Sequence, residues 1–199
     1  MTTYPINPPP VVASTETLRL SHNQGVMISP FSGNQVTVNN FAEWSLELGF
    51  NPMSLANAKA FTAWRASLRG ATGTFLYQPH GSGKNLNGKT LAATAFPYSQ
   101  TISVGGWTGG AASQLVGGDY LSINNTLFQI ISVPAVADGN GRVLIEVSPN
   151  TRAQFATGSS VNFSSPKGRF RLIEGQDGAG LSRDADTVSV GTLSAREAL

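Results

Sequence analysis

Residues 80–84 read His-Gly-Ser-Gly-Lys and bring together the side chains most able to do chemistry in this chain. Together with Asp119, this segment supplies the residue types of a hydrolytic triad, in which a histidine base activates a serine hydroxyl. No Gly-x-Ser-x-Gly turn between a strand and a helix accompanies them. A phosphate-binding loop would need a glycine where Gln78 stands and a serine or threonine where Asn85 stands. A flexible hairpin loop is therefore the simpler interpretation of residues 80–84.

The other titratable groups are scattered along the chain. His22 and His80 are the only histidines, and neither has a companion at a spacing typical of metal ligands. Glu43 and Glu47 share one face of an expected strand, but an outer face explains them better than a pair of catalytic acids. Residues 138–141, Asp-Gly-Asn-Gly, lack the alternating acids of a calcium loop and favour a turn. We expect no catalytic, cofactor-binding or metal-binding residue, and we predict that the protein is not an enzyme.

Three residues are candidates for contact with a partner. Arg169 and Arg171 alternate with apolar residues, so they share one strand face, which is either a solvated outer face or a contact for an acidic protein. Trp107 lies in a glycine-rich segment and is expected to be anchored in a core or an interface. With Tyr98 and Tyr120 it could also form a sugar-binding face.

The composition narrows the classes of function. The chain has 199 residues, no cysteine, 12% charged residues and a formal net charge of +2. The missing cysteines exclude disulfides and thiolate chemistry, and the small charge gives no argument for nucleic-acid binding. No apolar run is long enough to span a membrane. So few charges predict a surface that is largely covered by neighbouring molecules.

One strand and one helix are the clearest elements. Residues 44–50 alternate between large apolar side chains and polar or small ones, which is typical of a half-buried strand. The Asn-Asn pair at residues 39–40 predicts a turn before this strand. Ser54 is a suitable N-cap for an amphipathic helix over residues 54–69, which Gly70 would end.

Short β segments separated by glycine and asparagine make up most of the remaining chain. The predicted fold class is mainly β, an antiparallel β-sandwich or barrel with this one helix and extended terminal arms. We expect an N-terminal arm (1–15), a β-sandwich-like domain with the helix (16–104), a small β-barrel-like domain (105–173) and a flexible C-terminal arm (174–199). The arms are predicted to clasp neighbouring copies through residues 4–12 and 187–190. The candidate inter-subunit contacts are Tyr4, Pro8, Pro9, Val11, Val188 and Val190.

A series of motifs resembles a known family. Residues 61–70, Phe-Thr-Ala-Trp-Arg-Ala-Ser-Leu-Arg-Gly, followed by Gly-Thr-Phe at 73–75, are similar to the helix-then-strand segment of minor tail proteins of bacteriophages with long, non-contractile tails. Further motifs of the series lie at residues 106–107, 115–120, 138–141, 147–152 and 166–172. The resemblance covers about residues 40–173, and within the family it points to a distal tail protein.

This resemblance implies a structural role. A distal tail protein would form a ring, as a homohexamer, that joins the tail tube to the tail tip or baseplate, with residues 105–165 as its small barrel. The implied partners are sibling copies, the tail tube protein and the tip or hub proteins, with no nucleic-acid specificity. The implied location is the virion tail, after assembly in the host cytoplasm. Two alternatives stay open: a carbohydrate-binding module of a tail tip, and another minor tail component such as a tail-completion protein.

Overall fold

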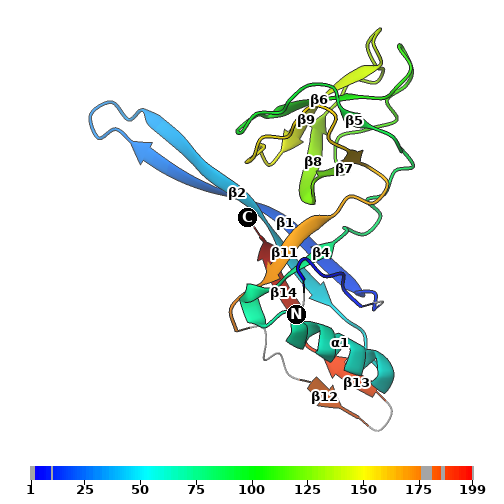
Figure 1. Ribbon diagram of the computed structural model, residues 1–199. Helices are drawn as coiled ribbons and strands as arrows, with labels where there is room; N and C mark the ends of the chain where they lie inside the picture. Colours follow the sequence, from blue (N-terminus) through cyan, green and yellow to red (C-terminus); the bar gives the residue numbers. More distant parts are fainter. Residues whose placement is uncertain (1–2, 10, 176–180, 185–186, 199) are drawn as a thin grey trace.

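The structure, a computed structural model, describes residues 3–9, 11–175, 181–184 and 187–198. These residues form three antiparallel sheets and one α-helix, which confirms the expected mainly β fold. Two hydrophobic cores organise the chain, one beneath a five-stranded sheet and one inside a small barrel. A long hairpin projects from them (Figure 1).

The five-stranded sheet has the strand order β1-β2-β14-β11-β4. Its strands are β1 (Thr15–Ile28), β2 (Gln35–Gly49), β14 (Leu193–Glu197), β11 (Gly168–Leu172) and β4 (Thr74–Tyr77). The alternation predicted for residues 44–50 is confirmed, because Trp44 and Leu46 on the inner face are 2% and 0% exposed. Phe75 of β4, Phe170 of β11 and Ala195 of β14 are fully buried in the same core. Every strand of this sheet except β1 therefore contributes buried side chains to the core.

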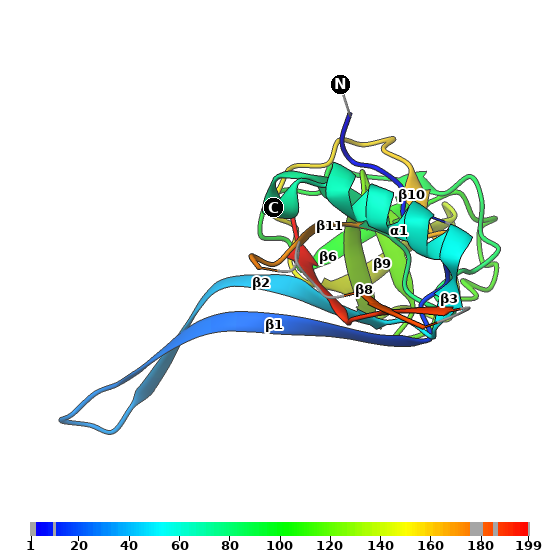
Figure 2. The same ribbon diagram turned by 90° about the horizontal axis from the view of Figure 1, so that it is seen from below.

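Strands β1 and β2 form a hairpin whose distal half extends well beyond the body of the protein, as both views show (Figures 1 and 2). The chain reverses direction at residues 29–34, where Gly33 has a φ of +68°. The turn predicted at residues 39–40 is wrong. The two strands stay paired there, and the register shifts between Asn23 and Gln24 on the opposite strand. The extra residue of β2 is thus accommodated as a bulge, which bends the strand without ending it.

The predicted helix is confirmed as α1 (Leu55–Ser67). The side chain of Ser54 accepts a hydrogen bond from the backbone N of Asn57 at 3.4 Å, as expected of an N-cap. Trp64 packs edge-on against Phe75, with ring centroids 5.3 Å apart, so the helix lies against the inner side of the sheet. Among the described residues, no helix is long and apolar enough to span a bilayer.

The C-terminal segment is part of the fold, which corrects the prediction of a flexible arm over residues 174–199. Strand β14 lies between β2 and β11 in the large sheet. A smaller sheet contains β12 (Leu181–Arg183), β13 (Thr187–Val190) and β3 (Met53–Ser54). Apolar residues alternate along β13 and β14 and are buried in the first core, and this burial outweighs the polar character of the preceding segment. Residues 176–180, 185–186 and 199 of the predicted arm lie outside the described residues.

The second core is the interior of a six-stranded barrel with the order β10-β7-β8-β9-β6-β5. Its strands are β5 (Thr90–Leu91), β6 (Thr101–Gly105), β7 (Tyr120–Ile123), β8 (Thr126–Ser132), β9 (Arg142–Ser148) and β10 (Val161–Asn162). A bridge between Thr90 and Ser160 joins the first strand to the segment that leads into the last. The backbone N of Leu91 also donates to the carbonyl oxygen of Ser159 at 2.9 Å. These contacts close the sheet on itself.

The barrel is inserted between two neighbouring strands of the large sheet. Strands β4 and β11 pair directly, with Tyr77 opposite Gly168, and the barrel connects them. The predicted barrel boundaries of 105 and 173 therefore move toward the N-terminus. Strands β5 and β6 belong to the barrel although they precede residue 106, and β11 belongs to the large sheet.

Candidate functional site

The distal half of the hairpin exposes apolar side chains to solvent. Phe31 in the loop is 99% exposed, and Met27 stands directly opposite Val36 on one face of the ribbon. The exposed apolar residues of this segment are Val26, Met27, Ile28, Phe31, Val36 and Val38. Residues 20–42 contain no Asp, Glu, Lys or Arg. An uncharged apolar ribbon of this kind is a candidate interaction surface, because folded chains rarely leave such surfaces in water.

The same hairpin also has open backbone edges. Strand β1 is the outermost strand of its sheet and pairs only with β2. Strand β14 covers the other edge of β2 no further than Ser45, so the stretch from Gln35 to Glu43 has no ladder partner besides β1 among the described residues. Unpaired edges can accept a strand from another chain.

The opposite edge of the sheet is closed by the chain's own N-terminal arm. The backbone N of Ile6 donates to the carbonyl oxygen of Thr74 at 3.0 Å, and the N of Leu76 donates to that of Ile6 at 3.0 Å. The hydroxyl of Tyr4 donates to the carbonyl oxygen of Ser67 at the end of α1, at 2.5 Å. The arm therefore completes its own sheet, which corrects the prediction that it clasps a neighbour.

The individual arm residues follow this pattern. Tyr4 and Val11 pack against the first core of their own chain, and Pro8 is exposed while Pro9 is half-buried. Val188 and Val190 are only 3% and 7% exposed. They lie in the chain's own core because β13 pairs with β3, so the structure removes them from the candidate inter-subunit contacts.

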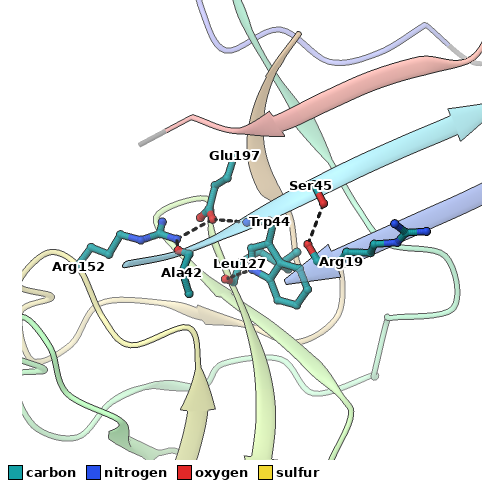
Figure 3. A network of polar contacts seen from close by, with 7 residues as sticks. All are labelled: Arg19, Ala42, Trp44, Ser45, Leu127, Arg152 and Glu197. Atoms are coloured by element: carbon teal, nitrogen blue, oxygen red, sulfur yellow. Dashed lines mark hydrogen bonds and ion pairs between the residues drawn. The ribbon is translucent and has the colours of Figure 1, made fainter. Parts of the chain in front are cut away.

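A buried polar junction connects the root of the hairpin to the barrel and to the C-terminal strand (Figure 3). Glu197 is 3% exposed, and its Oε2 accepts hydrogen bonds from the backbone N of Trp44 at 3.2 Å and from Nη2 of Arg152 at 2.9 Å. Arg152, in the loop after β9, also donates to the carbonyl oxygen of Ala42. The indole Nε1 of Trp44 donates to the carbonyl oxygen of Leu127 in β8 at 3.1 Å. The junction thus fixes the direction in which the hairpin leaves the barrel.

The residues of the possible triad are each engaged elsewhere. The Nδ1 atom of His80 lies 3.3 Å from Oε2 of Glu16. The hydroxyl of Ser82 donates to the carbonyl oxygen of Pro79 at 2.6 Å, and Asp119 forms an ion pair with Lys84. No nucleophile–base pair results. Among the described residues, no group of three or more His, Cys, Asp or Glu side chains could hold a metal ion.

Glu16 also affects two tyrosines. The hydroxyl of Tyr77 donates to its Oε2 at 3.0 Å. The pKa of Tyr77 is raised far above its ordinary value, first by burial and then by the charge of Glu16 and this hydrogen bond. Burial, followed by the charge of Glu16, also raises the pKa of Tyr120. These groups stay protonated at neutral pH and act as structural hydrogen-bond donors or packing groups.

The three aromatic residues considered as a sugar-binding face lie apart. Trp107 is half-buried in the barrel, where its Nε1 donates to the carbonyl oxygen of Ser113 at 3.2 Å and its ring packs on Phe163. Tyr120 packs on Trp44, with ring centroids 6.0 Å apart. Tyr98 alone stays exposed. Trp107 is therefore an anchor within its own barrel, which was one of the expected roles.

The predicted common face of Arg169 and Arg171 is confirmed by the register of β11. Arg171 stands opposite Arg196 of β14, and Phe170 between the two β11 arginines is buried in the core. Within the part of the chain that the structure describes, none of these arginines forms an ion pair with a carboxylate. Their contact with an acidic partner remains a prediction.

Comparisons with known proteins do not assign a family. No protein-family model matches the chain, and a search of curated proteins finds no match. The class of the protein is therefore inferred from its motifs and its geometry. Sequence reasoning missed the projecting hairpin and its exposed apolar residues, although the absence of charge over residues 20–42 is a signal that could have found them.

Proposed function

We propose that the chain is a structural component of a bacteriophage tail, which forms a ring at the distal end that joins the tail tube to the tail tip. The observation that carries this proposal is the projecting hairpin, with its uncharged apolar distal half and open strand edges. The motifs that resemble minor tail proteins support the same class.

A closed ring needs a heterologous contact, in which one surface of a copy binds a different surface of the next. An arm that leaves the body in one direction meets this requirement, because it reaches a neighbour on one side only. The buried junction at Glu197 supports the proposal by holding the arm at a constant angle, which a ring with a fixed copy number requires. The hairpin takes the clasping role first predicted for the terminal arms.

The remaining features of the proposal follow from the resemblance. The ring is a homohexamer, its partners are the tail tube protein and the tip or hub proteins, and the protein acts in the virion after assembly in the host cytoplasm. The role is structural and not enzymatic. This is supported by the separate engagement of His80, Ser82 and Asp119. Placement as another minor tail component, such as a tail-completion protein, would use the same hairpin.

The test is the mass of the protein in solution. Replacing residues 25–38 by an Asn-Gly turn shortens the hairpin but leaves both cores intact, since none of these residues belongs to either core. The unaltered chain has a mass of 20.8 kDa. We expect it to form an oligomer in analytical ultracentrifugation and the shortened chain to sediment as a monomer. Val12→Ser is the matched control, because it removes an apolar side chain that is 80% exposed outside the hairpin.

Two results would contradict the proposal. Assembly of the shortened chain to the same mass as the complete chain would show that the hairpin is not the contact. A complete chain that stays monomeric up to its solubility limit would show that the hairpin does not drive self-assembly.

A further inference from the structure

A groove lies between the root of the hairpin and the barrel. Its volume is about 440 Å³, within the range of small-molecule sites. The hairpin contributes His22 and Phe41 to its walls, and the barrel contributes Tyr98, Ile131 and Glu146. The groove thus combines exposed aromatic and aliphatic surface with polar side chains. It borders the polar junction, which shares Ala42 and Arg152 with its walls.

The backbone presents Tyr98 to this groove in an unfavourable conformation. Its side chain is 79% exposed, and its φ of +66° lies in the left-handed region that residues with a side chain rarely adopt. The fully buried Thr151 holds the turn in place. Its carbonyl oxygen accepts from the N of Tyr98 at 2.5 Å, and its Oγ1 accepts from the N of Ser99 at 3.0 Å and donates to the carbonyl oxygen of Phe96 at 2.5 Å. A strained residue that is held this firmly, with its ring in solvent, indicates function.

Two β-bulges face the same groove. The β8–β9 register shifts between Ile130 and Ser132, and the intervening Ile131 lines the groove while 51% exposed. The hairpin register shifts between Asn23 and Gln24, and Gln24 also lines the groove. Bulges redirect side chains and are common beside binding sites. Three separate backbone irregularities therefore meet at one place.

The charges of the groove favour a neutral ligand. Arg152 lines it, but its guanidinium is already paired with Glu197 and bound to the carbonyl oxygen of Ala42. Glu146 is the only carboxylate among the lining residues. The charge of Arg152 is already offset by Glu197, so a phosphate or another anion would meet the Glu146 carboxylate without a balancing cation from this arginine.

The barrel wall of the groove is closed to strand addition. Strand β9 is paired with β8 on one side and β6 on the other, so it offers no free backbone edge for strand addition. The polar side chains on this wall include the planar amides of Gln100 and Asn150 and the planar carboxylate of Glu146, beside the hydroxyl of Ser148. Such planar groups can hydrogen-bond pairs of neighbouring hydroxyls.

We propose that this groove binds a neutral oligosaccharide. The C–H face of a sugar ring packs on the exposed ring of Tyr98, and Gln100, Asn150 and Glu146 hydrogen-bond its hydroxyls. This binding is separate from ring formation, because the apolar distal half of the hairpin is not part of the groove.

The test uses the complete chain and a microarray of bacterial surface polysaccharides, followed by calorimetry with the arrayed glycan that binds best. The informative variant is Tyr98→Gly, because glycine suits the positive φ and removes only the ring. We expect its melting temperature to be equal to or higher than that of the unaltered chain, and its glycan affinity to fall about tenfold or more. The matched control is Phe31→Ala at the hairpin tip, which should leave glycan affinity unchanged.

Three outcomes would overturn this inference. One is the absence of binding to every arrayed glycan, and another is unchanged affinity of Tyr98→Gly. The third is a loss of oligomeric mass in Tyr98→Gly, which would show that a second copy of the chain fills the groove. The hairpin-shortening test uses a different variant, so failure of the saccharide site and failure of the ring can be told apart.

Discussion

Removing the carboxylate of Glu197 should destabilise the protein far more than its position near the C-terminus suggests. Glu197→Ala leaves the buried N–H of Trp44 without an acceptor, which costs about 1–3 kcal/mol, and removes a charge-assisted hydrogen bond from Arg152, worth about 1.5–3 kcal/mol. The Arg152 side chain is 25% exposed and keeps its bond to Ala42, so water and this carbonyl partly offset the loss. We therefore expect a loss of about 2–4 kcal/mol in the free energy of unfolding.

A second variant separates the two contacts. Glu197→Gln keeps an oxygen that can accept from Trp44 but removes the negative charge, so the expected loss is about 1–2 kcal/mol. Glu47→Ala is the control, because this exposed glutamate lies on the outer face of the same sheet and should change stability by less than about 0.5 kcal/mol. Urea denaturation followed by far-ultraviolet circular dichroism measures all three. The reasoning is refuted if Glu197→Ala behaves like Glu47→Ala, or if the two Glu197 variants lose equal stability.

Two further predictions concern pH and backbone conformation. The pKa of Tyr77 is raised above its ordinary value of 10.0, so the native state holds this proton more tightly than the unfolded chain. Its contribution is complete below about pH 10 and is lost as the pH rises, so urea midpoints should fall steeply above that pH, less so in Tyr77→Phe; equal slopes would contradict this. Gly141→Ala places a Cβ against a backbone carbonyl oxygen at a φ of +70°, whereas Gly139→Ala meets nothing within 4 Å. Thermal melts should show a loss of about 1–3 kcal/mol for Gly141→Ala and little for Gly139→Ala, and equal effects would refute the steric argument.

Features governed by neighbouring residues could be predicted from the sequence. The alternation over residues 44–50 identified the inner face of β2, and Ser54 identified the start of the helix. The two-residue turn between β7 and β8 consists of Asn124 and Asn125, which both adopt positive φ, and an asparagine pair is typical of such a turn. In each case the pattern lies within a few consecutive residues, so no knowledge of distant contacts was needed.

Features that depend on which chain supplies a strand could not be predicted. The alternating pattern of Val188 and Val190 is the same whether the strand adds to its own sheet or to a neighbour's, and only the position of β3 decides between them. The N-terminal arm posed the same ambiguity until Ile6 was placed beside β4. The groove is also invisible in the sequence, because Phe41 and Tyr98 meet there only once the barrel is set against the hairpin.

Because the barrel is inserted between the paired strands β4 and β11, it occupies a position where another domain could be inserted instead. Tyr77 and Gly168 face each other across adjacent strands, so the two ends of the inserted segment lie only one strand spacing apart. A tight hairpin turn could bridge that gap, and so could any other domain whose termini lie close together. Exchange of the inserted domain at this point would keep the pairing of β4 with β11, but the new domain would have to supply partners for Glu197 and for the indole of Trp44.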